Sequence, residues 1–203
     1  MTRRLSRDEA AQALGELRGE TDRCRECPLG ERATQSVCGE GAVHAKIMVV
    51  GEQPGDREDL QGRPFVGPAG GLLDRGLAEL GWSREALYVT NAVKHFKYEL
   101  RGKRRMHKTP AQREIEACHH WLEREIAIVR PAAFIALGAT AARALLGRRV
   151  AVLSERGRWH EDAAGRPVLV TLHPSALLRG DPQQRDAAWA AWLADLRIAL
   201  PPR

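Results

Sequence analysis

Residues 46–56 read KIMVVGEQPGD, a short apolar run that ends in a loop of glycine, proline and acidic residues. A few consecutive apolar residues bounded by turn signals are typical of a strand buried on both faces. The same pattern recurs in LYVTNAV (87–93), AAFIAL (132–137) and VLVTL (168–172). Each run therefore predicts a buried strand of one sheet.

Segments with helical spacing lie between and around these runs. Strands that alternate with helices indicate an α/β fold with a mostly parallel sheet. A minor strand is predicted at residues 149–153. The predicted helices span residues 7–20, 71–80, 110–129, about 138–146 and about 183–199.

Polar segments, three of which contain glycine or proline, follow the predicted strands: GEQPGD (51–56), TNAVKH (90–95), LGAT (137–140) and LHPSALLR (172–179). Open α/β sheets bind their ligands at the carboxyl ends of the strands. We therefore expect the functional site to be assembled from these four segments.

The chain has 203 residues and 43% hydrophobic residues, which predicts one domain over residues 1–203 with a packed core. No apolar run approaches the roughly 20 residues of a membrane span. The first residues, MTRRLSRDEA, have no apolar segment typical of a secretory signal. We therefore expect a protein of the bacterial cytosol, near the nucleoid, with no membrane partner.

Positive charge is concentrated in residues 94–108, which hold seven basic residues and one acidic residue. This stretch carries a net charge of +6, equal to that of the whole chain. A local field of this kind favours a polyanion such as nucleic acid. A solvated loop without a ligand is the alternative.

Five side chains outside the predicted helices have chemistry suited to a site. Glu52 can orient a base, Asn91 can pair with a donor and an acceptor, and Phe65 can stack on a planar ring. His173 lies before a proline, and His107 lies among cations that lower the pKa of its imidazole, which keeps it a nucleophile. Each also has a purely structural interpretation as a loop, core or surface residue.

Cys24 and Cys27 form a CxxC pair, and Cys38 and Cys118 complete the four cysteines of the chain. In a reducing compartment these are not expected to form structural disulfides. A CxxC turn brings two thiolates to one metal centre, but redox pairs and zinc sites share this spacing.

Taken together, four segments resemble the uracil-DNA glycosylase superfamily, in particular its iron–sulfur, family 4-like branch. They occur in the order of that family, and the spacing fits from residue 24 to about residue 197. The segments are the GE-x-PG loop at 51–55, GRPFVGPAG at 62–70, TNAVK at 90–94 and HPSALLR at 173–179.

Two further features resemble the UdgX-type members of this branch, which become covalently attached to uracil-containing DNA. Gln53 stands where ordinary family 4 members have alanine in GEAPG. KRRMH at 103–107 is similar to the KRRIH loop of UdgX, with Met106 as a conservative change from isoleucine.

The resemblance implies a three-layer αβα fold with a central, mostly parallel four-stranded sheet. It implies that Phe65 stacks on a flipped-out uracil, that Asn91 reads the amide edge of the base, and that His173 donates to uracil O2. It further implies that Glu52 orients His107 or takes its proton. His107 would then attack C1′ of the sugar, where water attacks in an ordinary glycosylase.

The resemblance also implies roles for residues around these five. Backbone contacts near Gln53 would fix the base, and Asp56 and Asp59 would support the same substrate-binding loop. The implied DNA-binding residues are Lys103, Arg104, Arg105, Ser175 and Arg179.

Family 4 members hold a [4Fe–4S] cluster with four cysteines, and Cys24, Cys27 and Cys118 match three of them. At the fourth position this chain has His95, and imidazole is an acceptable iron ligand. Cys38 is the rival fourth ligand, and a zinc site would satisfy the same residues. The cluster would fasten the N-terminal helix and the 95–118 segment to the sheet, without a redox role.

The sequence leads us to predict the first of three functions, with the other two as alternatives. The first is a single-turnover enzyme that excises uracil, with single-stranded DNA preferred because flipping costs little there, and stays bonded to the abasic sugar through His107. The second is a conventional hydrolytic glycosylase that releases free uracil, with KRRMH only binding phosphates. The third is a non-catalytic, metal-containing module that binds DNA. We expect a monomer in each case.

Overall fold

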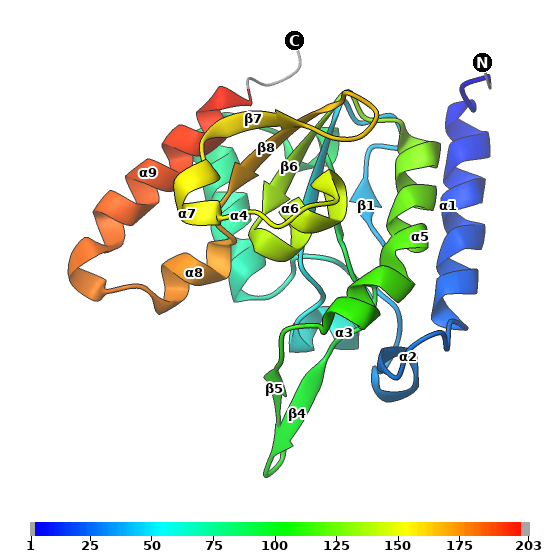
Figure 1. The fold of residues 1–203 in the computed structure, drawn as a ribbon. Helices are drawn as coiled ribbons and strands as arrows, with labels where there is room; N and C mark the ends of the chain where they lie inside the picture. Colours follow the sequence, from blue (N-terminus) through cyan, green and yellow to red (C-terminus); the bar gives the residue numbers. More distant parts are fainter. Residues whose placement is uncertain (1–2, 200–203) are drawn as a thin grey trace.

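The computed structural model describes residues 3–199, and Figure 1 shows how its elements are arranged. The main sheet has six strands in the order β1-β3-β2-β6-β8-β7. Its four inner strands are parallel to one another and confirm the four predicted runs. They are β3 (Tyr88–Asn91), β2 (Ile47–Gly51), β6 (Ala133–Leu137) and β8 (Pro167–Thr171).

Two antiparallel edge strands extend the predicted four-stranded sheet. β1 (Glu40–Gly41) pairs with β3, and β7 (Arg158–Glu161) pairs with β8. Neither contains an apolar run that the sequence analysis could detect. The minor strand predicted at 149–153 is wrong: Val152–Glu155 forms the short helix α7, where the Ala151 N–H donates to the Glu155 carboxylate at 2.8 Å.

Helices cover both faces of the sheet and give the three layers that the resemblance implied. Alternate residues of a strand point to opposite faces, so Val49 of β2 joins one core and Val50 joins the other. The first core is closed by α4 (Pro68–Glu79), α8 (Pro174–Arg179) and α9 (Arg185–Ile198). The second is closed by α5 (Gln112–Val129) and α6 (Ala139–Leu146).

Helix α1 (Arg7–Asp22) lies beside α5, on the side of α5 away from the sheet (Figure 1). Leu17 of α1 packs against Ile115 and Trp121 of α5 in a third apolar cluster. The remaining short helices are α2 (Leu29–Arg32), α3 (Asp56–Gln61), η1 (Arg84–Ala86) and η2 (Pro182–Gln184). Within residues 3–199, no helix combines the length and the apolar character that crossing a membrane requires.

The basic stretch forms a β-hairpin, which the sequence analysis did not predict. β4 (Tyr98–Arg101) and β5 (Arg104–His107) pair antiparallel as a separate two-stranded sheet that projects from the body of the molecule (Figure 1). Charged residues occupy both faces of the hairpin near its tip, so the alternation of apolar and polar residues that reveals a half-buried strand is missing.

Candidate active site

A cavity of about 820 Å³ lies where the four parallel strands end, as the sequence analysis predicted. Residues that follow β2, β3, β6 and β8 line it on one side. The hairpin contributes Met106 and His107, and α8 contributes Leu178 and Arg179 at the rim. The structure therefore brings the predicted catalytic residues and both predicted base-contacting side chains, Phe65 and Asn91, to one cavity.

Phe65 forms one wall of this cavity in a strained conformation. Its side chain is buried, its φ is +54°, and its ring centroid lies 5.9 Å from that of His173. Such φ values are costly for a bulky residue and persist where the surroundings impose them. Gly51 permits the close approach, since a Cβ there would lie 2.5 Å from Phe65 Cζ and 2.4 Å from Asn91 Oδ1.

Asn91 presents a buried hydrogen-bond acceptor to the cavity. Its side chain is 2% exposed, and Oδ1 has no hydrogen-bond partner among the residues that the structure describes. The backbone is held from behind, because Lys94 Nζ donates to the Asn91 carbonyl at 2.8 Å and to Glu125 at 2.7 Å. Buried acceptors are rarely left unpaired in proteins, so Oδ1 is suited to a ligand that brings a donor.

His173 presents a hydrogen-bond donor to the same cavity. Its Nδ1 accepts a hydrogen bond from the Ser175 backbone N–H at 3.2 Å and lies 2.8 Å from Ser175 Oγ. Burial, with the charges of His107 and Arg179, lowers the pKa of His173 to about 4. The ring is therefore neutral near pH 7, and because Nδ1 accepts from the backbone, its proton is on Nε2.

His107 and Glu52 approach each other across the cavity. His107 Nε2 lies 3.6 Å from Glu52 Oε1, and about half of the His107 side chain is exposed. The pKa of His107 is lowered, mainly by burial of the ring, and Arg179 acts in the same direction while Glu52 opposes it. The imidazole is thus neutral near pH 7 and available as a nucleophile or a base.

Gln53 binds the hairpin with its side chain. Its Nε2 donates to the backbone carbonyls of Lys97 at 3.3 Å and Lys108 at 2.9 Å, and its Oε1 accepts from the Lys97 N–H at 3.0 Å. Lys97 and Lys108 face each other at the base of the hairpin, where the Lys108 N–H donates to the Lys97 carbonyl. The Gln53 amide therefore ties the hairpin to the loop after β2.

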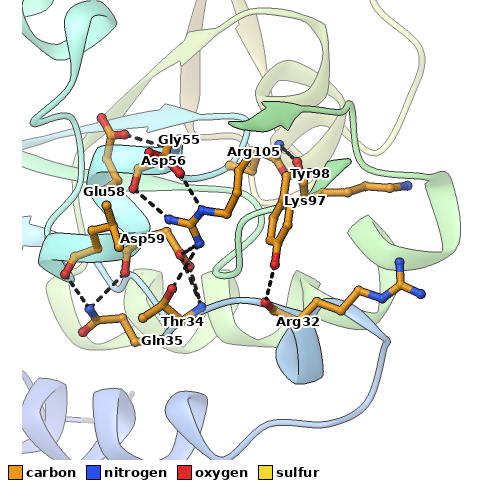
Figure 2. A network of polar contacts seen from close by, with 12 residues as sticks. Arg32, Thr34, Gln35, Gly55, Asp56, Glu58, Asp59, Lys97, Tyr98 and Arg105 are labelled. Atoms are coloured by element: carbon orange, nitrogen blue, oxygen red, sulfur yellow. Dashed lines mark hydrogen bonds and ion pairs between the residues drawn. The ribbon is translucent and has the colours of Figure 1, made fainter. Parts of the chain in front are cut away.

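Arg105 is also engaged within the protein, as Figure 2 shows. Its guanidinium donates to Asp56 at 2.6 Å and to Asp59 at 2.5 Å, and Asp59 also accepts from the Thr34 N–H. Asp59 is fully buried, so it supports the hairpin from beneath and does not face the cavity. The structure thus directs Arg105 at two carboxylates, whereas the sequence analysis expected a DNA contact.

The other predicted DNA-binding residues are placed differently. Lys103 and Arg104 are exposed near the tip of the hairpin, and Arg179 is exposed at the rim of the cavity. Ser175 lines the cavity, with its amide and hydroxyl beside His173. DNA contact by these four residues stays a prediction.

Two residues of the site were missed from the sequence. Glu58 is buried and accepts from the Gly55 N–H at 3.1 Å and from the Gly67 N–H at 2.8 Å, which joins the loop after β2 to the Phe65 loop. Thr140 Oγ1 donates to Glu52 Oε2 at 2.7 Å. Thr140 lies in a segment that the sequence analysis had singled out, and Glu58 lies between two of them, but nothing in the sequence indicated these pairings.

Comparison with known proteins gives the family. The family profile described as "Uracil DNA glycosylase superfamily" matches residues 38–197. The chain belongs to the uracil-DNA glycosylase superfamily.

Three relatives from this superfamily carry the name Type-4 uracil-DNA glycosylase. The protein from Thermotoga maritima is 39% identical over 86% of this chain and 86% of its own length. The protein from Pyrobaculum aerophilum is 40% identical, with 77% and 80% covered. The protein from Archaeoglobus fulgidus is 34% identical, with 82% and 84% covered. These matches confirm the resemblance to family 4.

The cysteines predicted as metal ligands lie together in the cluster between α1 and α5. Cys24 and Cys27 pack against the cluster that contains Cys118. Two sulfurs accept hydrogen bonds, since the Lys94 N–H donates to Cys118 Sγ at 3.2 Å and Trp121 Nε1 donates to Cys24 Sγ at 3.4 Å. Burial raises the pKa of the Cys118 thiol to about 12, so this thiol ionises only where a metal replaces its proton.

His95 is buried, with 3% of the residue exposed. Burial lowers the pKa of its imidazole, which gives the neutral ring that a metal requires. The donor chemistry of these four residues thus fits an iron–sulfur centre of the kind that the sequence resemblance implied. Within the part of the chain that the structure describes, no three His, Cys, Asp or Glu side chains converge as one metal ion needs. The arrangement of these side chains therefore does not distinguish a cluster from a single zinc ion.

Proposed function

We propose that this chain excises uracil from DNA. The observation that carries the proposal is the pairing of an unpartnered acceptor, Asn91 Oδ1, with a donor, His173 Nε2–H, beside the ring of Phe65 in one cavity. The amide edge of uracil offers an N–H donor next to carbonyl acceptors. Asn91 matches the donor and His173 matches a carbonyl, while Phe65 provides a surface for stacking.

Excision begins when the nucleotide leaves the base stack, which costs a few kcal/mol in a duplex and little in a single strand. The glycosidic electron pair passes to the base, and negative charge develops on uracil O2 while positive charge develops on the sugar. The neutral His173 ring then donates from Nε2 to this oxygen. Glu52, whose side chain is 23% exposed, faces the cavity with a carboxylate that offsets the positive charge of the sugar.

The relatives favour hydrolysis as the second step, since all three are named uracil-DNA glycosylases of Type 4. In this scheme water adds to C1′, its proton passes to a carboxylate or to solvent, and free uracil and abasic DNA are released. Glu52, which lines the cavity, is the carboxylate that would accept that proton. This is the alternative that the sequence analysis had set beside the adduct.

The position of His107 favours a second candidate, in which the chain itself captures the sugar. The imidazole lines the same cavity as Asn91 and His173, has a lowered pKa and lies 3.6 Å from Glu52. One ring nitrogen would use its lone pair to bond to C1′, the other would lose its proton to Glu52 or solvent, and uracil would leave with the glycosidic electrons. The product is a covalent histidine–sugar adduct and a single turnover.

A denaturing gel distinguishes the two fates. Wild type and His107→Ser are incubated with a single-stranded oligonucleotide that contains one uracil, and free uracil is measured in parallel. A band that survives SDS and heat in wild type but not in His107→Ser supports the adduct. Multiple turnover without such a band supports hydrolysis. Absence of uracil release from wild type on any DNA contradicts both, and favours a module that only binds DNA.

We propose further that Cys24, Cys27, Cys118 and His95 hold a [4Fe–4S] cluster, which would join α1 and the segment before the hairpin to the sheet. The cluster would supply a structural fastening and no electron transfer. Visible absorption and iron and sulfide analysis of protein purified without oxygen test this assignment, and zinc without sulfide would contradict it. Three earlier expectations stay predictions: that the whole chain forms one domain, that it is a monomer, and that it is located in the cytosol.

A further inference from the structure

The segment LGAT (137–140), which follows β6, has no part in the function proposed above. Gly138 has a φ of +89°, and a Cβ there would lie 3.2 Å from His173 Cβ. This turn starts α6, and it places Thr140 in the first turn of that helix with only 9% of the residue exposed. The segment therefore touches His173 with its backbone and reaches Glu52 with the Thr140 side chain.

The two carboxylate oxygens of Glu52 have different neighbours: one accepts a hydrogen bond from Thr140, and the other faces His107. Thr140 Oγ1 donates to Oε2 at 2.7 Å, while Oε1 is the oxygen that lies 3.6 Å from His107 Nε2. The terminal torsion of a glutamate side chain has broad, weakly defined minima. Without a partner on Oε2, the carboxylate is free to rotate and to leave His107.

We propose that Thr140 is a positioning residue that holds Glu52 with one oxygen toward His107 and the reacting sugar. The inference rests on the proposed function, because the role of Glu52 in excision depends on it. It adds a requirement that neither hydrolysis nor capture by His107 includes: a hydroxyl from the first turn of α6 must hold the Glu52 carboxylate. The charged and titratable groups that face His107 are Glu52, Glu58, Arg179 and His173.

Three variants test the proposal. Thr140→Val removes the hydroxyl at nearly constant shape, and Thr140→Ser keeps it. Thr21→Val is the matched control, since Thr21 is a buried helical threonine whose Oγ1 donates to the Leu17 carbonyl far from the cavity. We expect the single-turnover rate of uracil release to fall about 100-fold in Thr140→Val, as for a misplaced catalytic group. Thr140→Ser and Thr21→Val should stay close to wild type.

A second measurement does not depend on catalysis. The titration of the His107 ring is followed by NMR in wild type, Thr140→Val and Thr140→Ser. Because Glu52 raises the pKa of His107 from a fixed position, its midpoint should fall in Thr140→Val and remain unchanged in Thr140→Ser. An unchanged or raised midpoint in Thr140→Val overturns the inference, as does a Thr140→Ser variant that is as slow as Thr140→Val.

The two measurements also separate the inference from the proposed function. If wild type releases no uracil while the His107 midpoint falls as expected, the proposed function fails and the positioning role stands. If wild type releases uracil and Thr140→Val equals it in rate and midpoint, the function stands and the inference fails. Thermal unfolding of each variant identifies a loss of rate that comes only from unfolding.

Discussion

One side of the cavity is formed by the carboxyl ends of the sheet strands, and the other by the β4–β5 hairpin. On the sheet side, Asn91 is 2% exposed and Phe65 is 5% exposed. On the hairpin side, the His107 side chain is 49% exposed, and polar bonds from Gln53 and Arg105 hold the hairpin in place. The side chains proposed to recognise the base therefore belong to the packed core, while the position of His107 depends on a few polar contacts.

The largest expected effect is on the sheet side. His173→Ala removes the donor to the departing base, and loss of one such donor costs about 100- to 1,000-fold in kcat. Steady-state or single-turnover release of uracil measures this loss, while fluorescence anisotropy measures binding of the DNA. A variant that loses binding but keeps kcat would contradict the role of His173 at the leaving group.

Removal of Arg105 should affect stability more than chemistry. Arg105→Ala leaves the fully buried Asp59 without its cation, and breaking a buried ion pair in this way costs about 3 kcal/mol of unfolding free energy. Urea unfolding measures the change. Arg104→Ala is the matched control, because Arg104 is exposed and its loss should shift stability by less than about 0.5 kcal/mol. Equal effects would show that Arg105 does not anchor the hairpin.

Gln53→Leu should loosen the hairpin without disturbing the sheet. The variant loses three hydrogen bonds at the hairpin base, each with a net value of about 1 kcal/mol. Amide hydrogen exchange in residues 97–108 should accelerate about 10-fold or more, while β2 and β3 stay protected. Gln112→Leu, a change at a half-buried glutamine on α5 that makes no bond to the hairpin, serves as the control. Equally accelerated amide exchange in the inner strands would show that Gln53 does not stabilise the hairpin side of the cavity alone.

A pH dependence of stability should arise on the sheet side. The folded pKa of His173 is about 4, below the ordinary value of about 6.5, so the unfolded chain binds more protons between these values. The free energy of unfolding should therefore fall as pH drops from about 6.5 to about 4, by about 1–2 kcal/mol after allowance for solvent screening. His173→Asn should remove this part of the dependence in urea unfolding. An unaltered slope would show that the folded ring titrates normally.

The smallest effect concerns the hairpin tip. Lys103→Ala should weaken DNA binding by a similar factor for all sequences and reduce the slope of log K against log salt by about 1. Titrations at several salt concentrations measure this slope. Leu100→Ala, an exposed change on the same hairpin, should leave it unaltered. A constant slope in Lys103→Ala would mean that the tip does not touch phosphate.

The sequence predicted the parallel sheet and the edge of the sheet that holds the cavity, because buried strands and their polar ends are local patterns. Residues such as Asn91 and His173 were found because they lie directly at those ends. The hairpin escaped prediction, since its strands carry charge near the tip and only pairing across Tyr98–His107 defines them. Gln53 and Arg105 differ from expectation for a related reason: their partners, Lys108 and Asp59, are distant in sequence.

The closed base of the hairpin has an architectural consequence. The Lys108 N–H donates a hydrogen bond to the Lys97 carbonyl at 3.0 Å, so the chain leaves the body and returns to it at one point. The segment between them is thus a single excursion of the chain, which Gln53 holds at its base and the buried Asp59 holds through Arg105. A change in the length of this excursion would alter the side of the cavity that His107 lines, while the ends of the sheet strands stay in place.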